Sequence, residues 1–379
     1  MAEKPIGSIE ESFAGLEDPR IERKKLHKLL DKIVIAICGV ICGADNWVDI
    51  EMFGEKKINW LRQFLELPNG IPSHDTFGRV FGLLDEKQFQ QCFYEWVKAV
   101  QEVTKGQVIA LDGKQLRGSL DGYIGKGAIY MVNAWASANH IALGERKVDE
   151  KSNEITAIPQ LLDMLEVSGC IITIDAMGCQ TAIAQQIVAK QADYVLAVKE
   201  NQGHLYEDIS YLFDLYVKEE NPLEFIDDYH KTVNKDHGRI ETRRCYTLAA
   251  DRYQASIRNM SEWEHMRSLV LVISERQIGT ETTTQSRYFI SSAPPIASKM
   301  LEAVRSHWGV ENGLHWILDV VFDEDHSRVR KDNAPQNLAV IRQMALNLLK
   351  KEKNAKGGIQ AKRLQAAWDE NYLLKVLSV

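Results

Sequence analysis

Apolar residues in the first part of the chain recur every three to four positions, which predicts helices separated by turns. The expected helices are Asp31–Phe53, Ile58–Leu67, a segment capped by Ser73, and Glu86–Val103. Between the second and the third lies Leu67–Pro72, whose sequence LPNGIP predicts a turn. Short helices around such a turn are typical of a helix-turn-helix-like DNA-binding module, and equally of a plain helical bundle.

The pattern changes in the middle of the chain, where short uninterrupted apolar runs predict buried strands. The elements expected in order are strand Val108–Leu111, a hairpin of Ala128–Ser137 and Ile141–Val148, helix Asn153–Glu166, strand Ile171–Ile174, helix Gln180–Lys190 and strand Tyr194–Val198. Three strands, a helix, a strand, a helix and a strand is the order of the RNase H-like fold. We therefore predict the α/β class, with an RNase H-like mixed-sheet catalytic core and an N-terminal helical domain.

A β-rich insertion is expected after this core. Its predicted strands are Ile240–Ala249, Ser268–Ile278 and Gln285–Ser292. A helix then begins near Ser298, and a further helix begins after Asp332 with one apolar face.

The resulting division of the chain has five parts. They are a helical DNA-binding region at 1–105, the first part of the core at 106–205, the β-rich insertion at 206–292, the second part of the core with its C-terminal helix at 293–350, and a basic tail at 351–379.

Composition narrows the class of protein. Of 379 residues, 45% are hydrophobic and 26% charged, as in a soluble globular protein. The longest apolar run, Ile33–Ala44, is shorter than the roughly 20 residues that a membrane helix needs, and the polar N-terminus predicts no signal peptide. Six cysteines without a CxxC pair predict reduced core thiols, so we expect a cytoplasmic protein with no membrane partner.

Charge is distributed unevenly around a net charge of −7. Residues Glu207–Asp228 contain eight acids and one lysine, whereas Ser327–Ala366 contain ten Lys or Arg and two acids. The basic segment fits either a phosphate backbone or a solvated helix face.

Two carboxylates follow buried strands and suggest the chemistry. Asp112 follows the first strand, with Gly113 marking its end, and Asp175 follows the fourth strand. Strands one and four are neighbours in an RNase H-like sheet, so these two carboxylates predict a site for a hard cation.

A third carboxylate is expected on a helix after the last strand, and we assign it to Glu311. Its rivals are Glu200, Asp319, Asp323, Glu324 and Asp325. His307 and His315 lie four residues before and after Glu311, on the same helix face. These two histidines and Glu311 could together bind zinc, so zinc stays open as an alternative, although no HExxH motif accompanies them.

Three carboxylates suit Mg²⁺ or Mn²⁺ better than zinc. Two such ions, about 3.5–4 Å apart, support in-line phosphoryl transfer without a covalent enzyme intermediate. The chain has no GxSxG, P-loop or GxGxxG motif, so the sequence favours neither a serine hydrolase, an NTPase nor a dinucleotide-binding enzyme.

Several motifs together give the chain a family resemblance. They are LEDPR at Leu16–Arg20, GIPSHDTFGRV at Gly70–Val80, ALDGKQLRGS at Ala110–Ser119, TIDAMGCQ at Thr173–Gln180, VKENQ at Val198–Gln202, HGRIETR at His237–Arg243 and HWGVENGLHWILDVVFDED at His307–Asp325. In this order they resemble a DDE transposase of the H-repeat-associated, Rhs-linked insertion-sequence family. The resemblance implies metal-dependent cleavage and strand transfer at the element's ends, with Asp112, Asp175 and Glu311 binding two Mg²⁺ or Mn²⁺ ions.

One departure from related transposases concerns their Tyr–Arg–Glu–Lys signature. Counted from Glu311, its other positions hold Val304, His307 and Leu318. Other basic residues are therefore candidate DNA contacts, with surface turns and a solvated hairpin as alternatives. The candidates are Lys114, Arg117, His237, Arg239, Arg243, Arg305 and His307, with His74 and Arg79 in the helical region beside Ser73 and Thr76.

The resemblance also implies partners and a location. We expect the chain to bind terminal inverted repeats and target DNA, to form a homodimer in the synaptic complex, and to act in the bacterial cytoplasm at the nucleoid. Two alternatives stay open at this point: an RNase H-like nuclease that cuts without joining, and an inactive DNA-binding relic that acts as a regulator.

Overall fold

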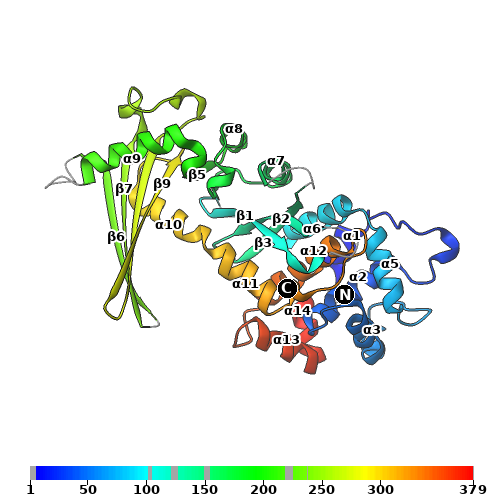
Figure 1. The fold of residues 1–379 in the computed structure, drawn as a ribbon. Coiled ribbons are helices and arrows are strands. Elements are labelled where there is room, and N and C mark those ends of the chain that lie inside the picture. The colour runs from blue at the N-terminus through cyan, green and yellow to red at the C-terminus, as the bar shows by residue number, and fades with distance from the viewer. Residues whose placement is uncertain are drawn as a thin grey trace.

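The fold was examined in a computed structural model that describes residues 6–100, 105–120, 127–148, 154–217, 225–236 and 238–378. One mixed sheet of nine strands runs through the centre of it, in the order β3-β2-β1-β4-β5-β9-β8-β7-β6. A helical body lies at one end of the sheet, and the strands β6–β9 project at the other end (Figure 1).

The first five strands of the sheet have the predicted RNase H-like arrangement. They are β1 (Val108–Leu116), β2 (Ile129–Ala136), β3 (Ile141–Lys147), β4 (Ile171–Ile174) and β5 (Asp193–Val198). β2 pairs antiparallel with β1 and β3, whereas β4 pairs parallel with β1 and β5. The helices α7 (Glu154–Met164) and α8 (Thr181–Ala189) make the parallel connections. The predicted fold class is confirmed.

The predicted end of the first strand is wrong. β1 continues through Asp112 and Gly113 to Leu116, because its antiparallel ladder with β2 extends to the pair Leu116↔Ile129. On the other side of β1, β4 ends at Ile174. Asp112 therefore lies inside β1 but level with the carboxyl end of β4.

The remaining strands extend the same sheet. β6 (Asp228–Asp236), β7 (Arg239–Ala249), β8 (Ser268–Ile278) and β9 (Glu281–Ser291) form an antiparallel unit that joins the core where β9 pairs with β5. The sequence did not predict β6, because its DYHKTVNKD segment has no buried residue in this edge position.

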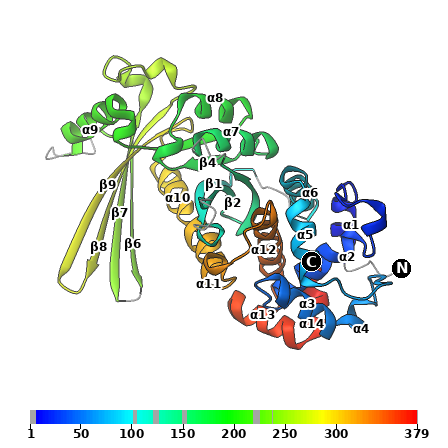
Figure 2. The same cartoon turned by 45° about the vertical axis from the view of Figure 1, so that its right-hand side comes forward.

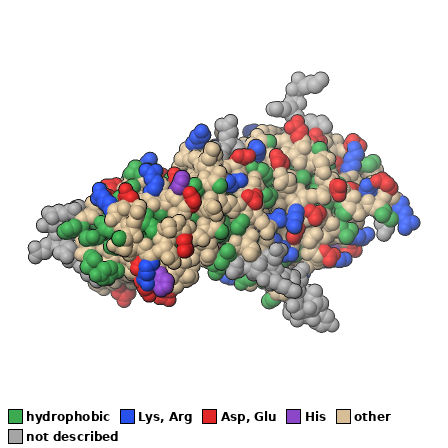
Figure 3. Space-filling view, turned by 90° about the horizontal axis from the view of Figure 1, so that it is seen from above, with side chains coloured by type: hydrophobic (Ala, Val, Ile, Leu, Met, Phe, Trp, Pro, Cys, Tyr) green, Lys and Arg blue, Asp and Glu red, His purple; other side chains and the backbone are tan. Residues whose placement is uncertain are grey.

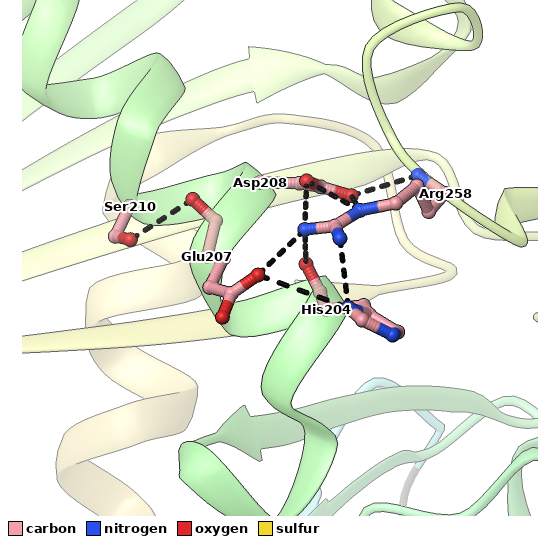
Figure 4. A network of polar contacts seen from close by, with 5 residues as sticks. All are labelled: His204, Glu207, Asp208, Ser210 and Arg258. Atoms are coloured by element: carbon pink, nitrogen blue, oxygen red, sulfur yellow. Dashed lines mark hydrogen bonds and ion pairs between the residues drawn. The ribbon is translucent and has the colours of Figure 1, made fainter.

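A helix that the sequence also did not predict covers part of this extension. It is α9 (Gly203–Val217), which buries Leu205, Ile209, Leu212 and Phe213. Arg258, in the loop after β7, binds Asp208 and Glu207 of α9 through its guanidinium and so ties that loop to the helix (Figure 4). The extension is therefore packed against a helix and is not a bare hairpin.

The N-terminal region is helical, as predicted, but its first long helix is broken. α2 (Leu29–Ile41) and α3 (Trp47–Lys56) are separated by Gly43, which has a φ of 107°, and by Asn46, whose side chain caps α3. The other helices here are α1 (Gly7–Phe13), α4 (Ile58–Leu61), α5 (His74–Leu83) and α6 (Glu86–Val100), and the predicted end of α6 at Val103 lies outside the described residues.

The C-terminal residues complete this helical body. α12 (Ala334–Lys351) is buried from Ala334 to Leu349 and contacts α2, α5, α6 and β3. The sequence predicted a helix with one apolar face here, whereas the structure has a central helix that is enclosed on all sides. The predicted basic tail forms α13 (Ile359–Trp368) and α14 (Glu370–Leu377), because Leu373, Val376 and Leu377 pack into the core.

Two further expectations concern the whole chain. All six cysteines are free and five of them are buried, as predicted for core thiols. Among the described residues, no helix has both the length and the apolar character needed to cross a membrane.

Candidate active site

The register of two parallel strands brings Asp112 and Asp175 together. Leu111 of β1 pairs with Ile174 of β4, so Asp112 and Asp175 are the next residues on neighbouring strands. The chain turns at once after Asp175, whose carboxylate accepts a hydrogen bond from the backbone N–H of Met177 at 3.1 Å. This bond fixes the side chain at the edge of the sheet.

Glu311 reaches the same place on a helix that crosses the sheet. α10 (Ala297–His307) contacts β1 and β4 and leads into a π-helical turn at Glu311–His315, followed by α11 (Trp316–Val320) (Figure 2). A π turn inserts an extra residue into a helix and often occurs at functional sites.

The two histidines around Glu311 anchor this helix to the sheet. His307 Nδ1 lies 3.0 Å from the Thr173 hydroxyl on β4, and His315 Nδ1 lies 3.6 Å from an Asp112 carboxylate oxygen. Burial lowers the pKa of both imidazoles, that of His315 to about 3 with a further contribution from the charge of Lys114. Both rings are therefore neutral at pH 7.

Asp112, Asp175 and Glu311 line one cavity of about 330 Å³. Lys199, Tyr206 and Arg287 line it too. Burial raises the pKa of Asp112 to about 7, and the negative charges of Asp175 and Glu311 contribute to that shift. Asp112 is therefore close enough to Asp175 and Glu311 to be affected by their negative charges.

A fourth carboxylate, Glu154, lies beside this cluster and was not predicted. A Cβ atom on Gly113 would lie 2.1 Å from the Glu154 carboxylate, so the end of the Glu154 side chain lies directly against the backbone next to Asp112. Burial, and after it the charge of Asp175, raises the pKa of Glu154. An acid in the first turn of a helix is common, so the sequence offers little signal for this residue.

The chemistry of this cluster fits a hard divalent cation. Its donors are carboxylate oxygens, and no lysine or arginine of the described residues forms an ion pair with Asp112, Asp175 or Glu311. As the side chains stand, no three His, Cys, Asp or Glu residues in the described ranges are arranged to hold a metal ion. Binding any metal ion here, magnesium, manganese or zinc, would therefore require side chains of the cluster to move.

The rival carboxylates have other partners. Asp319 and Glu324 both pair with Lys114, Asp325 lies 3.4 Å from Arg117, and Asp323 lies 2.6 Å from His326. Glu200 lines a separate, more open pocket that it shares with Asp175. Of all the candidates for the third position, only Glu311 lines the cavity of Asp112 and Asp175.

A second cavity, of about 540 Å³, continues from the first along the sheet extension. The two share Arg287 and Trp308, whose guanidinium and ring are stacked at 4.6 Å. The second cavity is lined by Arg243, Arg305 and Arg276, and the first two of these were predicted. Seen from above, the surface shows basic and acidic side chains interspersed (Figure 3). The groove too is mixed, because Glu241, which pairs with Arg243, and Glu275 line it beside the arginines.

The other predicted DNA contacts are dispersed. Lys114 is 7% exposed and held by two carboxylates, which removes it from the surface. Arg117 is 74% exposed, and Arg239 pairs with Glu241 at 3.1 Å.

The predicted contacts in the helical region lie apart from the carboxylates. His74 contacts Glu51 at 2.5 Å, and Arg79 lines a separate pocket with Arg20 and Arg23. His237 lies outside the described residues.

Comparison with known proteins gives consistent relatives. The family described as Transposase DDE domain matches residues 104–348, and its associated domain, described as DDE_Tnp_1-associated, matches residues 10–97. The "H repeat-associated putative transposase YhhI" of Escherichia coli (strain K12) is 41% identical over 377 residues, which are 98% of each chain. The "Putative transposase YncI" of Escherichia coli O157:H7 is 40% identical over 98% of this chain and 95% of its own.

Among solved structures, a piggyBac transposase synaptic complex with hairpin DNA aligns with 98% of this chain and 78% of its own. Its TM-score is 0.44 at 12% identity, a similarity too low to support an argument about this chain.

Proposed function

The chain belongs to the DDE transposase family, and from that premise we propose that it cuts DNA at the ends of its insertion sequence and joins them to target DNA. The proposal includes dependence on Mg²⁺ or Mn²⁺ and assigns Asp112, Asp175 and Glu311 as the metal ligands. Because the reaction brings two DNA ends together, we also propose that the chain works as a homodimer on terminal repeats, at the nucleoid in the bacterial cytoplasm.

One observation carries the assignment of residues. Two carboxylates on neighbouring strands and one on a crossing helix line a single cavity, and no described lysine or arginine pairs with them. Carboxylates gathered in one cavity, with the pKa of Asp112 raised, are typical of a functional site.

The residues of the site suggest how the reaction is arranged. When bound, two divalent ions would activate the attacking oxygen, first of water and then of the freed 3′-hydroxyl, and stabilise the leaving oxygen. His315 lies 3.6 Å from Asp112 and is neutral at pH 7, so it does not neutralise the charge that the ions require. Lys199, Tyr206 and Arg287 line the same cavity and are placed to contact a phosphate there.

The adjoining groove is our candidate path for the DNA. Arg276 and Arg305 supply positive charge along it, Arg243 lines it while paired with Glu241, and Trp308 supplies an aromatic surface where it meets the carboxylate cavity. Arginine fits phosphate through paired N–H groups, so this composition suits a nucleic-acid backbone. Arg117, Arg239, His74 and Arg79 remain candidate contacts outside the groove.

Cleavage of the element's own terminal DNA tests the proposal. The native chain should give Mg²⁺- or Mn²⁺-dependent nicks and strand-transfer products, and Asp175→Asn should abolish both, because it removes one ligand charge at constant size. Asp163→Asn, an exposed carboxylate on α7 outside the cavity, is the matched control and should cleave normally.

Each other outcome has a definite meaning. Nicks without joining would favour the nuclease, and DNA binding without cleavage by the native chain would favour the inactive relic. Undiminished cleavage by Asp175→Asn would reject the assigned residues.

A further inference from the structure

The position of Glu311 depends on how the helix that bears it is held against the sheet. Glu311 begins the π turn, so small shifts of that turn move its carboxylate relative to Asp112 and Asp175. Below the turn lies Trp135, a fully buried residue of β2 that pairs with Ala110 on the strand that carries Asp112. The helix therefore rests on the same two strands that position the first carboxylate.

Gly313 allows the closest approach between the turn and Trp135. A Cβ atom on Gly313 would lie 2.6 Å from the Cζ2 atom of Trp135, a distance that real Cβ atoms do not adopt. Gly309, one turn earlier, differs: a Cβ atom there would lie 3.5 Å from the Trp135 ring nitrogen, which is ordinary contact. Of these two glycines, only Gly313 is required by the packing.

Lys350, on α12, closes the arrangement from the other side. Its Nζ donates a hydrogen bond to the Gly313 carbonyl at 2.8 Å and lies 4.2 Å from the centroid of the Trp135 ring. Its side chain therefore joins the backbone of the π turn to the indole beneath it. An amine donates this bond whether or not it carries a charge, so the contact does not depend on its titration.

A further bond fixes the helix just before the turn. The Ser137 hydroxyl, directly after β2, donates to the Ser306 carbonyl at 3.0 Å. The end of β2 thus contacts α10 near its last residues as well as the π turn. The helix is held at two points on either side of Glu311.

We propose that Trp135, Gly313 and Lys350 form a positioning clamp that sets the height of Glu311 above the sheet and thereby the affinity of the carboxylate cluster for a divalent cation. The inference rests on the proposed function, since it takes Glu311 to be a metal ligand. None of the three residues contacts the metal or the DNA in this scheme; they act through the backbone of the turn.

The test compares Gly313→Ala with Gly309→Ala in the full-length chain. Both changes add one methyl group to the same helix and raise its helix propensity by a similar amount, so propensity cancels in the comparison. Mn²⁺ affinity, measured by electron paramagnetic resonance of the free ion, should weaken about 10- to 100-fold in Gly313→Ala, as for the loss of an outer-shell partner. Gly309→Ala should bind Mn²⁺ like the native chain.

Two further variants separate positioning from general damage. Lys350→Met keeps the length of the side chain and removes the hydrogen bond, so Mn²⁺ affinity should fall while thermal unfolding shows a folded protein. Trp135→Phe, combined with Gly313→Ala, removes the atoms that the new methyl group meets and should restore part of the affinity. If Gly313→Ala does not fold, Lys350→Met decides the matter.

Failure of the clamp can be distinguished from failure of the proposed function. Equal Mn²⁺ affinities of Gly313→Ala, Lys350→Met and the native chain would overturn the clamp and leave the metal site intact. A native chain that binds no Mn²⁺ would overturn the proposed function. In that case crystal structures of the two alanine variants decide the clamp, which requires that Glu311 move by more than about 0.5 Å in Gly313→Ala and not in Gly309→Ala.

Discussion

Two groups of carboxylates meet neighbouring residues of one strand, β1, and differ in whether a cation is paired with them. Asp112 and Lys114 are two residues apart on β1 and point to the same face of the sheet. Asp112 belongs to the unpaired cluster, with Asp175 and Glu311. Lys114 belongs to a paired cluster, with Asp319, Glu324 and Arg342.

The paired cluster is closed and compensated. Lys114 lies 2.6 Å from Asp319 and also contacts Glu324, which lies 3.6 Å from Arg342 on its other side. Glu324 is 2% exposed, and although burial opposes its charge, Lys114 and Arg342 hold its pKa below the ordinary value. Burial raises the pKa of Asp319 in spite of Lys114, and in the unpaired cluster it raises that of Asp112 to about 7, where neighbouring carboxylates add to the shift.

The difference indicates which carboxylates serve the architecture and which serve a ligand. A buried, ionised carboxylate without a cation costs several kcal/mol. In the unpaired cluster Asp112, with 19% of its side chain exposed, bears part of that cost, whereas Glu311 is exposed and does not. The paired cluster joins β1 to the segment after the Glu311 helix and stabilises the core. The unpaired cluster lowers stability and is retained, in our proposal, for divalent ions.

The largest expected effect comes from breaking the paired cluster. Lys114→Met should lower the free energy of unfolding by about 3–5 kcal/mol, because it leaves the buried Glu324, and the partly buried Asp319 beside it, with one cation fewer. Urea denaturation at pH 7 measures this change. Asp112→Asn in the unpaired cluster should not destabilise the protein under the same conditions, and a loss comparable to that of Lys114→Met would contradict the comparison.

A divalent ion should act on the unpaired cluster alone. At a free Mn²⁺ concentration 100 times the dissociation constant, binding to the folded state should add about 2.7 kcal/mol to the free energy of unfolding. Asp175→Asn should lose most of this gain, whereas Asp163→Asn should retain it. Thermal unfolding with and without Mn²⁺ measures this gain in stability. An equal gain in the two variants would mean that the ion binds at another site.

The pH dependence of stability should separate the clusters in metal-free buffer. The ordinary pKa of Asp112 is 3.8 and its pKa in the folded chain is about 7. A carboxyl group whose pKa is raised by folding stabilises the fold below the lower value and loses that contribution as the pH rises through the higher one.

The unfolding free energy of the native chain should therefore fall between about pH 4 and pH 7, relative to Asp112→Asn. Each pH unit between the two pKa values corresponds to about 1.4 kcal/mol, and the side chain keeps 19% of its surface exposed, so we expect on the order of 2 kcal/mol in total. If the free energy of unfolding changes with pH in the same way in the native chain and in Asp112→Asn, this prediction is wrong.

Much of the fold could be predicted from local patterns. The core strands are short apolar runs buried on both faces, and their order along the chain specifies the RNase H-like topology. The meeting of Asp112 and Asp175 follows from that topology, since they end the paired segment of two neighbouring parallel strands. Glu311 was assigned from its place on a helix after the last strand, whereas the partners of its rivals became known only from the folded chain.

What the sequence could not reveal depends on distant residues. The length of β1 is set by β2, so Gly113 continues a strand that its own sequence appeared to end. Lys114 looked like a surface cation next to a site, yet its partners lie about 200 residues later in the chain. β6 lacks any apolar pattern because an exposed edge strand needs none.

The smallest effect on stability is expected from a charge that lies outside both clusters. Arg117 is 74% exposed and lies 3.4 Å from Asp325, and such surface pairs contribute about 0–1 kcal/mol. Arg117→Ala should therefore leave the free energy of unfolding nearly unchanged, unlike Lys114→Met three residues before it. If Arg117 contacts a phosphate of the terminal DNA, its removal should weaken binding and reduce the slope of log affinity against log salt by about 1. Fluorescence anisotropy across a salt series measures both quantities, and an unchanged slope would make Arg117 a solvated surface residue, leaving the groove of Arg243, Arg276 and Arg305 as the candidate DNA path.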